Sequence, residues 1–219
     1  MDSRRGFLLK LLGSATALLT VDLSQTWASE GKKSRNLVRE SPDRENYIVP
    51  PGAESFTNFH HRCIGCQLCV SSCPNRVLNV KASHIVIDPK FGLLNLNQPA
   101  MSFEHGYCHP ECNKCSQVCP AGAILPVTLE RKSSIKIGLA KWKRELCRNT
   151  KGKTCRACVK FCPNEAIKLV PSDGDPQKIE LVIDPNRCVG CGACEYICRN
   201  YPKPAIYVDG FAEHGDKKG

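Results

Sequence analysis

The apolar residues of this chain come in short runs, which predict short strands rather than long helices. Segments 85–89 and 181–185 are apolar runs that end in Asp-Pro, and we expect each to form a β-strand. Near the N-terminus, the apolar run from Phe7 to Val21 is interrupted by glycine, serine and threonine. It is too short and too polar to predict a transmembrane helix.

Two polar segments flank the region that we expect to fold. Residues 29–58 are rich in charged residues, serine and proline, and we interpret them as a linker. Within this linker, residues 47–52 should be extended, because each proline disfavours helix in the residue before it. The tail 209–219 is polar, contains glycine, and is predicted to be flexible. The folded region should therefore span residues 59–208.

The sixteen cysteines constrain the interpretation most strongly. They form four groups of four with none left over: Cys63, Cys66, Cys69 and Cys73; Cys108, Cys112, Cys115 and Cys119; Cys147, Cys155, Cys158 and Cys162; Cys188, Cys191, Cys194 and Cys198. Groups one and four have the spacing C-x2-C-x2-C-x3-C. Group two has one extra residue after its first cysteine, and group three has seven residues between its first two. A proline follows the last cysteine in every group except the fourth, which has Arg199.

This spacing is typical of cysteines that ligate [4Fe–4S] clusters. The first three thiolates of a group stand on a loop that surrounds one cube and ligate it, and the fourth thiolate ligates the neighbouring cube. All sixteen cysteines are therefore predicted to be metal ligands, holding four [4Fe–4S] clusters in pairs. Each group precedes a short β-rich run, and group plus run resembles the half-unit of a bacterial ferredoxin. We expect an α+β fold of two ferredoxin-like, 2[4Fe–4S] units with short strands and short helices.

The charge of the chain is compatible with this prediction. The formal net charge is +10, from 31 basic and 21 acidic residues. Four clusters with their thiolates would contribute about −8. Because aromatic residues are few and no nucleic-acid-reading motif is present, we predict no nucleic-acid binding.

A basic segment at residues 131–160 has two interpretations. It carries eleven lysines and arginines against one acid, Glu145. These cations either compensate the charge of nearby clusters or form a docking face for an acidic redox partner or anionic lipid headgroups. Charge reversal at Lys141, Lys143 and Arg144 would distinguish the two.

Other uses of so many cysteines fit the pattern less well. Structural zinc favours paired C-x2-C motifs with a long gap between them, and cysteines two residues apart make awkward disulfide partners. A non-redox scaffold stabilised by metal or disulfides is the alternative from another functional class. No nucleotide-binding loop or nucleophile–base arrangement stands out, so we expect an electron carrier without catalytic residues and not an enzyme.

The N-terminal 28 residues are predicted to form an export signal. Arg4 and Arg5 precede Phe7 and Leu8 in a pattern that resembles a twin-arginine signal. That route carries folded proteins, so clusters are inserted before the thiols reach an oxidising compartment. We therefore expect a periplasmic protein that is exported folded, with peripheral membrane association as a further expectation.

The chain resembles the exported ferredoxin-type proteins of the NapG/MauM group. The resemblance rests on the twin-arginine start, PPGA at 50–53, IGLA at 137–140, the long Cys147–Cys155 gap and the ACEYIC…AIYV ending. It implies a carrier that passes single electrons between a membrane quinol-oxidising protein and a periplasmic redox enzyme. The alternative within the same chemistry is an electron-transfer subunit of a molybdenum reductase or hydrogenase complex.

The resemblance also implies a nested pairing of the cysteine groups. An outer unit, 59–107 plus 163–208, would surround an inner unit, 108–162. The four ligand sets would then be Cys63, Cys66 and Cys69 with Cys198; Cys188, Cys191 and Cys194 with Cys73; Cys108, Cys112 and Cys115 with Cys162; and Cys147, Cys155 and Cys158 with Cys119. Sequential pairing would exchange only the fourth ligand of each set.

Overall fold

The computed structural model describes residues 39–80, 86–88, 92–94, 97–172 and 175–216. The chain divides into two units, Met1–Leu37 and Val38–Gly219, and the second holds all the cysteines. The predicted export signal, with Arg4 and Arg5, lies outside the described residues.

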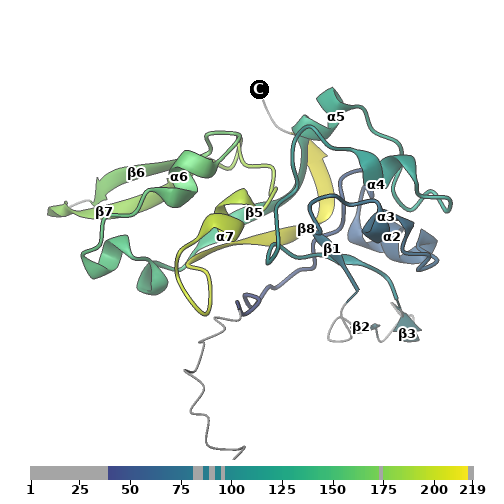
Figure 1. Ribbon diagram of the computed structural model, residues 1–219, viewed down its shortest axis with the longest axis horizontal. Helices are drawn as coiled ribbons and strands as arrows, with labels where there is room; N and C mark the ends of the chain where they lie inside the picture. The colour runs from purple at the N-terminus through teal and green to yellow at the C-terminus, as the bar shows by residue number, and fades with distance from the viewer. Residues whose placement is uncertain (1–38, 81–85, 89–91, 95–96, 173–174, 217–219) are drawn as a thin grey trace, which may run out of the picture. The chain divides into compact units, whose positions relative to one another are not determined.

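No helix within the described ranges is long and apolar enough to cross a membrane. Short helices and two-stranded antiparallel sheets make up the second unit (Figure 1). Its first half contains α2 (Phe56–Arg62), α3 (Leu68–Ser71), β1 (Leu78–Asn79), β2 (Val86–Asp88), β3 (Gly92–Leu94), β4 (Ala100–Met101), α4 (Lys114–Gln117) and α5 (Leu129–Ser134). Strand β1 pairs with β4, and β2 pairs with β3.

The second half begins with a longer strand. It contains β5 (Ile135–Trp142), the 3-10 turns η2 (Arg144–Leu146) and η3 (Asn149–Lys151), α6 (Ala157–Phe161), β6 (Ile167–Ser172), β7 (Asp175–Ile183), α7 (Ala193–Ile197) and β8 (Ile206–Asp216). Strand β5 pairs with β8, and β6 pairs with β7. The predicted mixture of short helices and strands is confirmed, but the run that follows group two, residues 120–127, forms no strand although a β-rich run was expected after each group. Its Leu125 N–H bonds instead to the Gly52 carbonyl at 2.8 Å.

Local side-chain bonds define the starts of two helices. The Ser55 hydroxyl accepts the Asn58 N–H ahead of α2, and the Thr128 hydroxyl accepts the Arg131 N–H ahead of α5. Such caps satisfy backbone donors that a helix leaves free at its first turn. The helices of this unit are so short that packing against the cysteine loops must supply most of their stability.

The unit has two hydrophobic cores, and each contains cysteines from two consecutive groups. The first core includes Phe59, Phe103 and Ile124 together with cysteines of groups one and two. The second includes Ile167 and Ile206 together with cysteines of groups three and four. Helix α3 packs on α4, and α6 packs on α7, in the same pairing.

The nested arrangement implied by the resemblance is therefore wrong. Groups one and two share one half of the structure, and groups three and four share the other. The reason lies in β5, whose eight residues separate groups two and three. At about 3.3 Å per residue, this strand holds its two ends about 26 Å apart. Groups two and three consequently do not form an inner unit.

The structure also corrects the two polar segments. The described part of the predicted linker is packed into the first core: Ile48 and Val49 are buried, and the Met101 N–H bonds to the Ile48 carbonyl at 2.9 Å. The predicted tail continues β8 as far as Asp216, where it pairs with Ile135 of β5. Composition alone did not show that these polar residues have partners elsewhere in the chain.

Candidate metal centres

All sixteen cysteines are free thiols, and each group places them in the same way. In each group the first two thiols stand on a loop, the third lies in a short helix, and the fourth lies just beyond the end of that helix. Cys69, Cys115, Cys158 and Cys194 occupy helices α3, α4, α6 and α7. The repeated sequence motif is therefore also a repeated structure.

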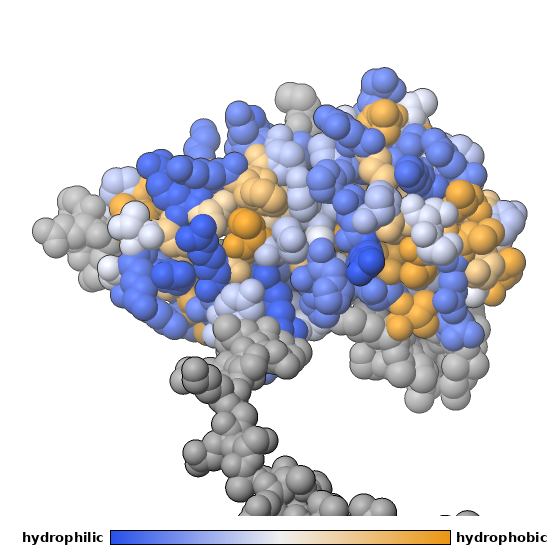
Figure 2. Space-filling model, in the orientation of Figure 1, coloured by the Kyte–Doolittle hydropathy of each residue, from blue (hydrophilic) through white to orange (hydrophobic). Residues whose placement is uncertain are grey.

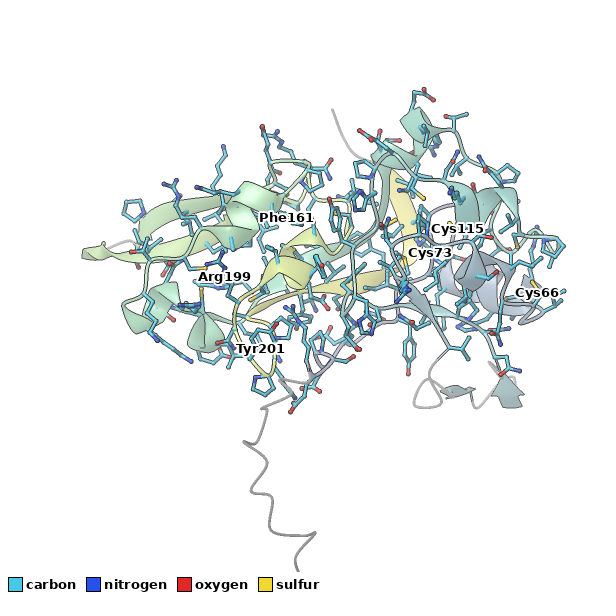
Figure 3. The ribbon with its side chains drawn as sticks, viewed as in Figure 1. Cys66, Cys73, Cys115, Phe161, Arg199 and Tyr201 are labelled. Carbon is cyan, nitrogen blue, oxygen red and sulfur yellow. The ribbon has the colours of Figure 1, made fainter. Side chains whose placement is uncertain are left out.

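In the first half, four thiols line one cavity. Cys108, Cys112 and Cys115 of group two face it together with Cys73 of group one, and its volume is about 350 Å³ including the solvent at its mouth. Figure 3 shows Cys73 and Cys115 next to each other, whereas Cys66 lies at the outer edge of this half. Three thiols of one group and the last thiol of its neighbour thus face a common space.

The second half repeats this arrangement. Cys147, Cys155 and Cys158 of group three line a cavity of about 370 Å³, again counted with solvent at its mouth, together with Cys198 of group four. The sets implied by nesting, in which Cys162 joins group two and Cys119 joins group three, are not brought together at these two cavities.

The two remaining sets follow the same rule, in which the last thiol of one group joins the first three of its neighbour. Burial raises the pKa of Cys63 and takes that of Cys69 to about 11, and the nearby Cys119 thiol adds to both shifts. Burial likewise raises the pKa of Cys188 and takes that of Cys191 to about 12, with Cys162 adding to both. Cys119 therefore lies near the group-one thiols and Cys162 near the group-four thiols.

Backbone N–H groups point at several sulfurs. Gly65 and Gly190 adopt left-handed φ values of 68° and 79°, and their N–H groups bond to Cys63 and Cys188. The Ala205 N–H bonds to the Cys198 sulfur at 3.3 Å, and the Ala166 N–H bonds to the Cys162 sulfur at 3.4 Å. Such bonds stabilise negative charge on sulfur and tune the potential of a bound cluster.

The thiol sets fit a group larger than one metal ion. Within the described residues, no three histidine, cysteine, aspartate or glutamate side chains converge closely enough to hold a single ion. Four thiols around a cavity suit an iron–sulfur cube, whose irons are spread over its corners, better than a zinc ion at one point. Burial raises the pKa of Cys69 to about 11 and those of Cys115 and Cys158 to about 12, so cluster binding must displace the protons of these thiols.

The two halves meet beside cysteines of groups two and four. The Cys108 N–H bonds to the Cys191 carbonyl at 2.9 Å. Both residues line a cavity that also contains Lys132, whose side chain is only 6% exposed. The Lys132 ammonium donates to the His109 carbonyl, and it lies within hydrogen-bond reach of the Cys108 thiol.

Sequence reasoning missed this buried lysine. Lys132 follows Arg131 in a basic segment, where a solvent-exposed side chain is the usual expectation. No spacing or motif distinguishes it from its neighbours. Of the positions suggested for docking, Lys141 pairs with Asp209 at 2.8 Å, and Arg144 pairs with Glu180. These two cations are already partly neutralised within the chain.

Comparison with known proteins agrees with the geometry. The 4Fe-4S dicluster domain model matches residues 62–123, which hold groups one and two, and 153–200, which hold group four and most of group three. Thus each match covers two consecutive groups, as each half of the structure does.

Several curated proteins are similar over most of the chain. The methylamine utilization ferredoxin-type protein MauM of Methylobacillus flagellatus is 32% identical over 74% of this chain and 68% of its own length. The ferredoxin-type protein NapG of Escherichia coli is 28% identical over 94% of this chain and 85% of its own. NapF of the same species is 26% identical over 77% and 88%. The chain therefore belongs to the family of 4Fe-4S dicluster proteins that includes the ferredoxin-type proteins MauM and NapG.

Proposed function

We propose that this protein relays single electrons through four [4Fe–4S] clusters and acts as a carrier, not as a catalyst. The observation that supports the proposal best is the pair of cavities, each faced by three thiols of one group and the fourth of its neighbour. This is the ligand pattern of paired cubes in two-cluster ferredoxins.

The four ligand sets then follow the sequential pairing. They are Cys63, Cys66 and Cys69 with Cys119; Cys108, Cys112 and Cys115 with Cys73; Cys147, Cys155 and Cys158 with Cys198; and Cys188, Cys191 and Cys194 with Cys162. When bound, each cube supplies a one-electron redox centre. The chain holds the cubes through its thiolates, directs N–H groups at the sulfurs and excludes water from the buried thiols.

The geometry also suggests an order for the relay. The set that contains Cys108 and the set that contains Cys191 meet where the two halves are hydrogen-bonded. We infer that the sets that contain Cys66 and Cys155 are the outer ones, because Cys66 lies at the outer edge of its half and Cys158 adjoins Cys194 of the neighbouring set. An electron would therefore enter at one of these outer sets, cross between the halves beside Cys108 and Cys191, and leave at the other.

The proposal includes export and partners. The twin-arginine pattern at Arg4 and Arg5 supports transport of the folded protein to the periplasm. There it would connect a membrane quinol-oxidising protein with a periplasmic oxidoreductase. The family resemblance supports this role, and the terminal acceptor has to be found by experiment.

Iron analysis combined with a redox titration tests the proposal. Protein purified without oxygen should contain about sixteen irons and sixteen acid-labile sulfides per chain, as four cubes require. Reductive titration followed by electron paramagnetic resonance should show four one-electron centres with magnetic coupling inside each half. Zinc, disulfides or a colourless protein from cells with intact cluster assembly would instead support a non-redox scaffold.

A further inference from the structure

The third cysteine group contains an insertion that the other groups lack. Seven residues separate Cys147 from Cys155, whereas two or three separate the first two cysteines elsewhere. The inserted residues form the turn η3, and Gly152 closes it with a left-handed φ of 70°. The insertion therefore has a defined conformation beside the cavity of group three.

Hydrogen bonds fix this loop at both ends. The Asn149 side chain donates to the Cys155 carbonyl at 2.8 Å and accepts the Cys155 N–H at 2.7 Å. The Thr150 hydroxyl donates to the Cys147 carbonyl at 2.8 Å. Because two cysteine backbones hold the loop, its backbone keeps a constant position relative to the thiols.

The loop and its surroundings carry six cations, which we call the basic face: Arg148, Lys151, Lys153, Arg156, Lys160 and Arg199. Arg148 and Arg199 line the thiol cavity itself, and Lys151, Lys153 and Arg156 are exposed. None of the six forms an ion pair among the described residues. Lys141 and Arg144, by contrast, are paired with acids.

The opposite outer set has a different surface. Ile64 and Leu68, on either side of the exposed Cys66, are 70% and 45% exposed. In Figure 2, hydrophobic residues gather over the end of the molecule that contains α2 and α3, whereas the surface around α6 is mostly hydrophilic, although Phe161 of α6 is 38% exposed. The two outer sets thus present different chemistry to a partner.

We propose that the basic face is a docking surface for an acidic protein that exchanges electrons with the set Cys147, Cys155, Cys158 and Cys198. This inference rests on the proposed function, because it assigns a partner class to one of the four sets. Unpaired cations around a redox site attract an acidic surface, speed its encounter and orient it, as in other transient complexes. An anionic lipid would be attracted as well, but it cannot exchange electrons.

Charge reversal with a matched control tests the proposal. The variant Lys151→Glu/Lys153→Glu is compared with Arg62→Glu/Lys168→Glu, which changes the net charge equally at exposed positions outside the basic face. The probe is flavodoxin, a small acidic electron-transfer protein, carrying a fluorescent label. Binding to the iron-loaded chain is measured by fluorescence anisotropy at several ionic strengths, so the readout does not depend on electron transfer.

We expect the loop variant to bind flavodoxin at least about tenfold more weakly at low ionic strength, with a flatter salt dependence. The control variant should bind within about twofold of the unmodified chain. Absence of binding by the unmodified chain, or equal losses in both variants, would overturn the proposal. The proposal would also be overturned if the chain bound phosphatidylglycerol vesicles through Lys151 and Lys153 and did not bind flavodoxin. Iron and sulfide contents measured on the same samples show separately whether the cluster proposal holds.

Discussion

Among the described residues, the buried cation Lys132 distinguishes one of the thiol sets from the others. Lys132 is 6% exposed, and its ammonium lies beside Cys108, where the two halves meet. Burial raises the pKa of Cys108, and the charge of Lys132 opposes that rise. The same charge would favour the additional electron of a reduced cube at this position, because low polarity strengthens the attraction.

Replacement of Lys132 should therefore change one reduction potential selectively. We expect Lys132→Met to lower the midpoint of one of the four centres by about 59 mV or more, which corresponds to a tenfold change in a one-electron equilibrium. Lys132→Arg should retain most of the potential because it retains the charge. Potentiometric titration followed by electron paramagnetic resonance measures both variants, and an equal shift of all four centres would contradict a local effect.

The buried residue His214 should make the stability of the folded chain depend on pH. Burial lowers the pKa of His214 from 6.5 to about 4, so this histidine is neutral in the folded chain at neutral pH. Glu54, Arg131 and Asp216 line the same cavity as His214. Between pH 6.5 and 4 the unfolded chain binds the proton more readily, so the stability contribution of His214 is lost as the pH falls through this window.

The variant His214→Gln should remove this component. From the size of the shift, we expect the stability difference between variant and unmodified chain to change by about 3 kcal/mol between pH 6.5 and 4, and to be constant above pH 7. Chemical unfolding followed by circular dichroism across this pH range measures the difference. A constant difference throughout would show that His214 titrates normally in the folded chain.

At the scale of elements, a buried ion pair attaches the N-terminal segment of the unit to α7. Both guanidinium nitrogens of Arg44 bind the Glu195 carboxylate, at 2.6 and 3.0 Å, and Glu195 also accepts the Val208 N–H at 2.9 Å. Glu195 is 2% exposed. Arg39 adds bonds to the carbonyls of Tyr196 and Cys198 at the end of the same helix. This segment therefore holds the last cysteine group in place.

Loss of one partner should cost more than loss of both charges. Arg44→Ala leaves a buried carboxylate without its cation, which typically costs about 3 to 5 kcal/mol. Combining it with Glu195→Gln should recover a substantial part of that loss, because a neutral amide is less costly to bury. Denaturant unfolding followed by loss of visible cluster absorbance compares the variants. A double variant less stable than Arg44→Ala would contradict this account.

At the scale of the whole molecule, export should depend on the paired arginines and on folding. Replacement of Arg4 and Arg5 by lysine should leave the iron-loaded protein in the cytoplasm, because the twin-arginine route reads that pair. Cell fractionation with an antibody against the chain measures the change. Unchanged delivery to the periplasm would exclude this route, whereas the iron content of the retained protein should be unaffected.

The repeated cysteine unit was predictable from the sequence, because the geometry of the loop that holds a cube determines the spacing of its cysteines. Strands at 85–89 and 181–185 were also predictable, since β2 and β7 overlap them. The pairing of groups was not predictable from spacing, because either pairing leaves each thiol set with four members. It is decided by β5, which carries the chain away from group two before group three begins.

The polar segments escaped prediction for a different reason. Residues 39–58 look like a linker by composition, but Arg44 and the buried Ile48 have partners more than 50 positions away. The burial of Lys132 escaped prediction for the same reason, because the His109 carbonyl and the Cys108 thiol that contact it lie more than 20 positions away in the sequence. Long-range contacts of this kind appear only in the folded structure.

The sequential pairing has a consequence for biogenesis. All eight cysteines of the first half precede residue 120, so a ribosome has released a complete set of thiols for two cubes while the remaining chain is still being made. A nested protein would have to await its final group before any outer cube could close. Clusters can therefore be inserted in two stages, first into the first half and then into the second. The ion pair between Arg44 and Glu195 forms only after Glu195 has been synthesised.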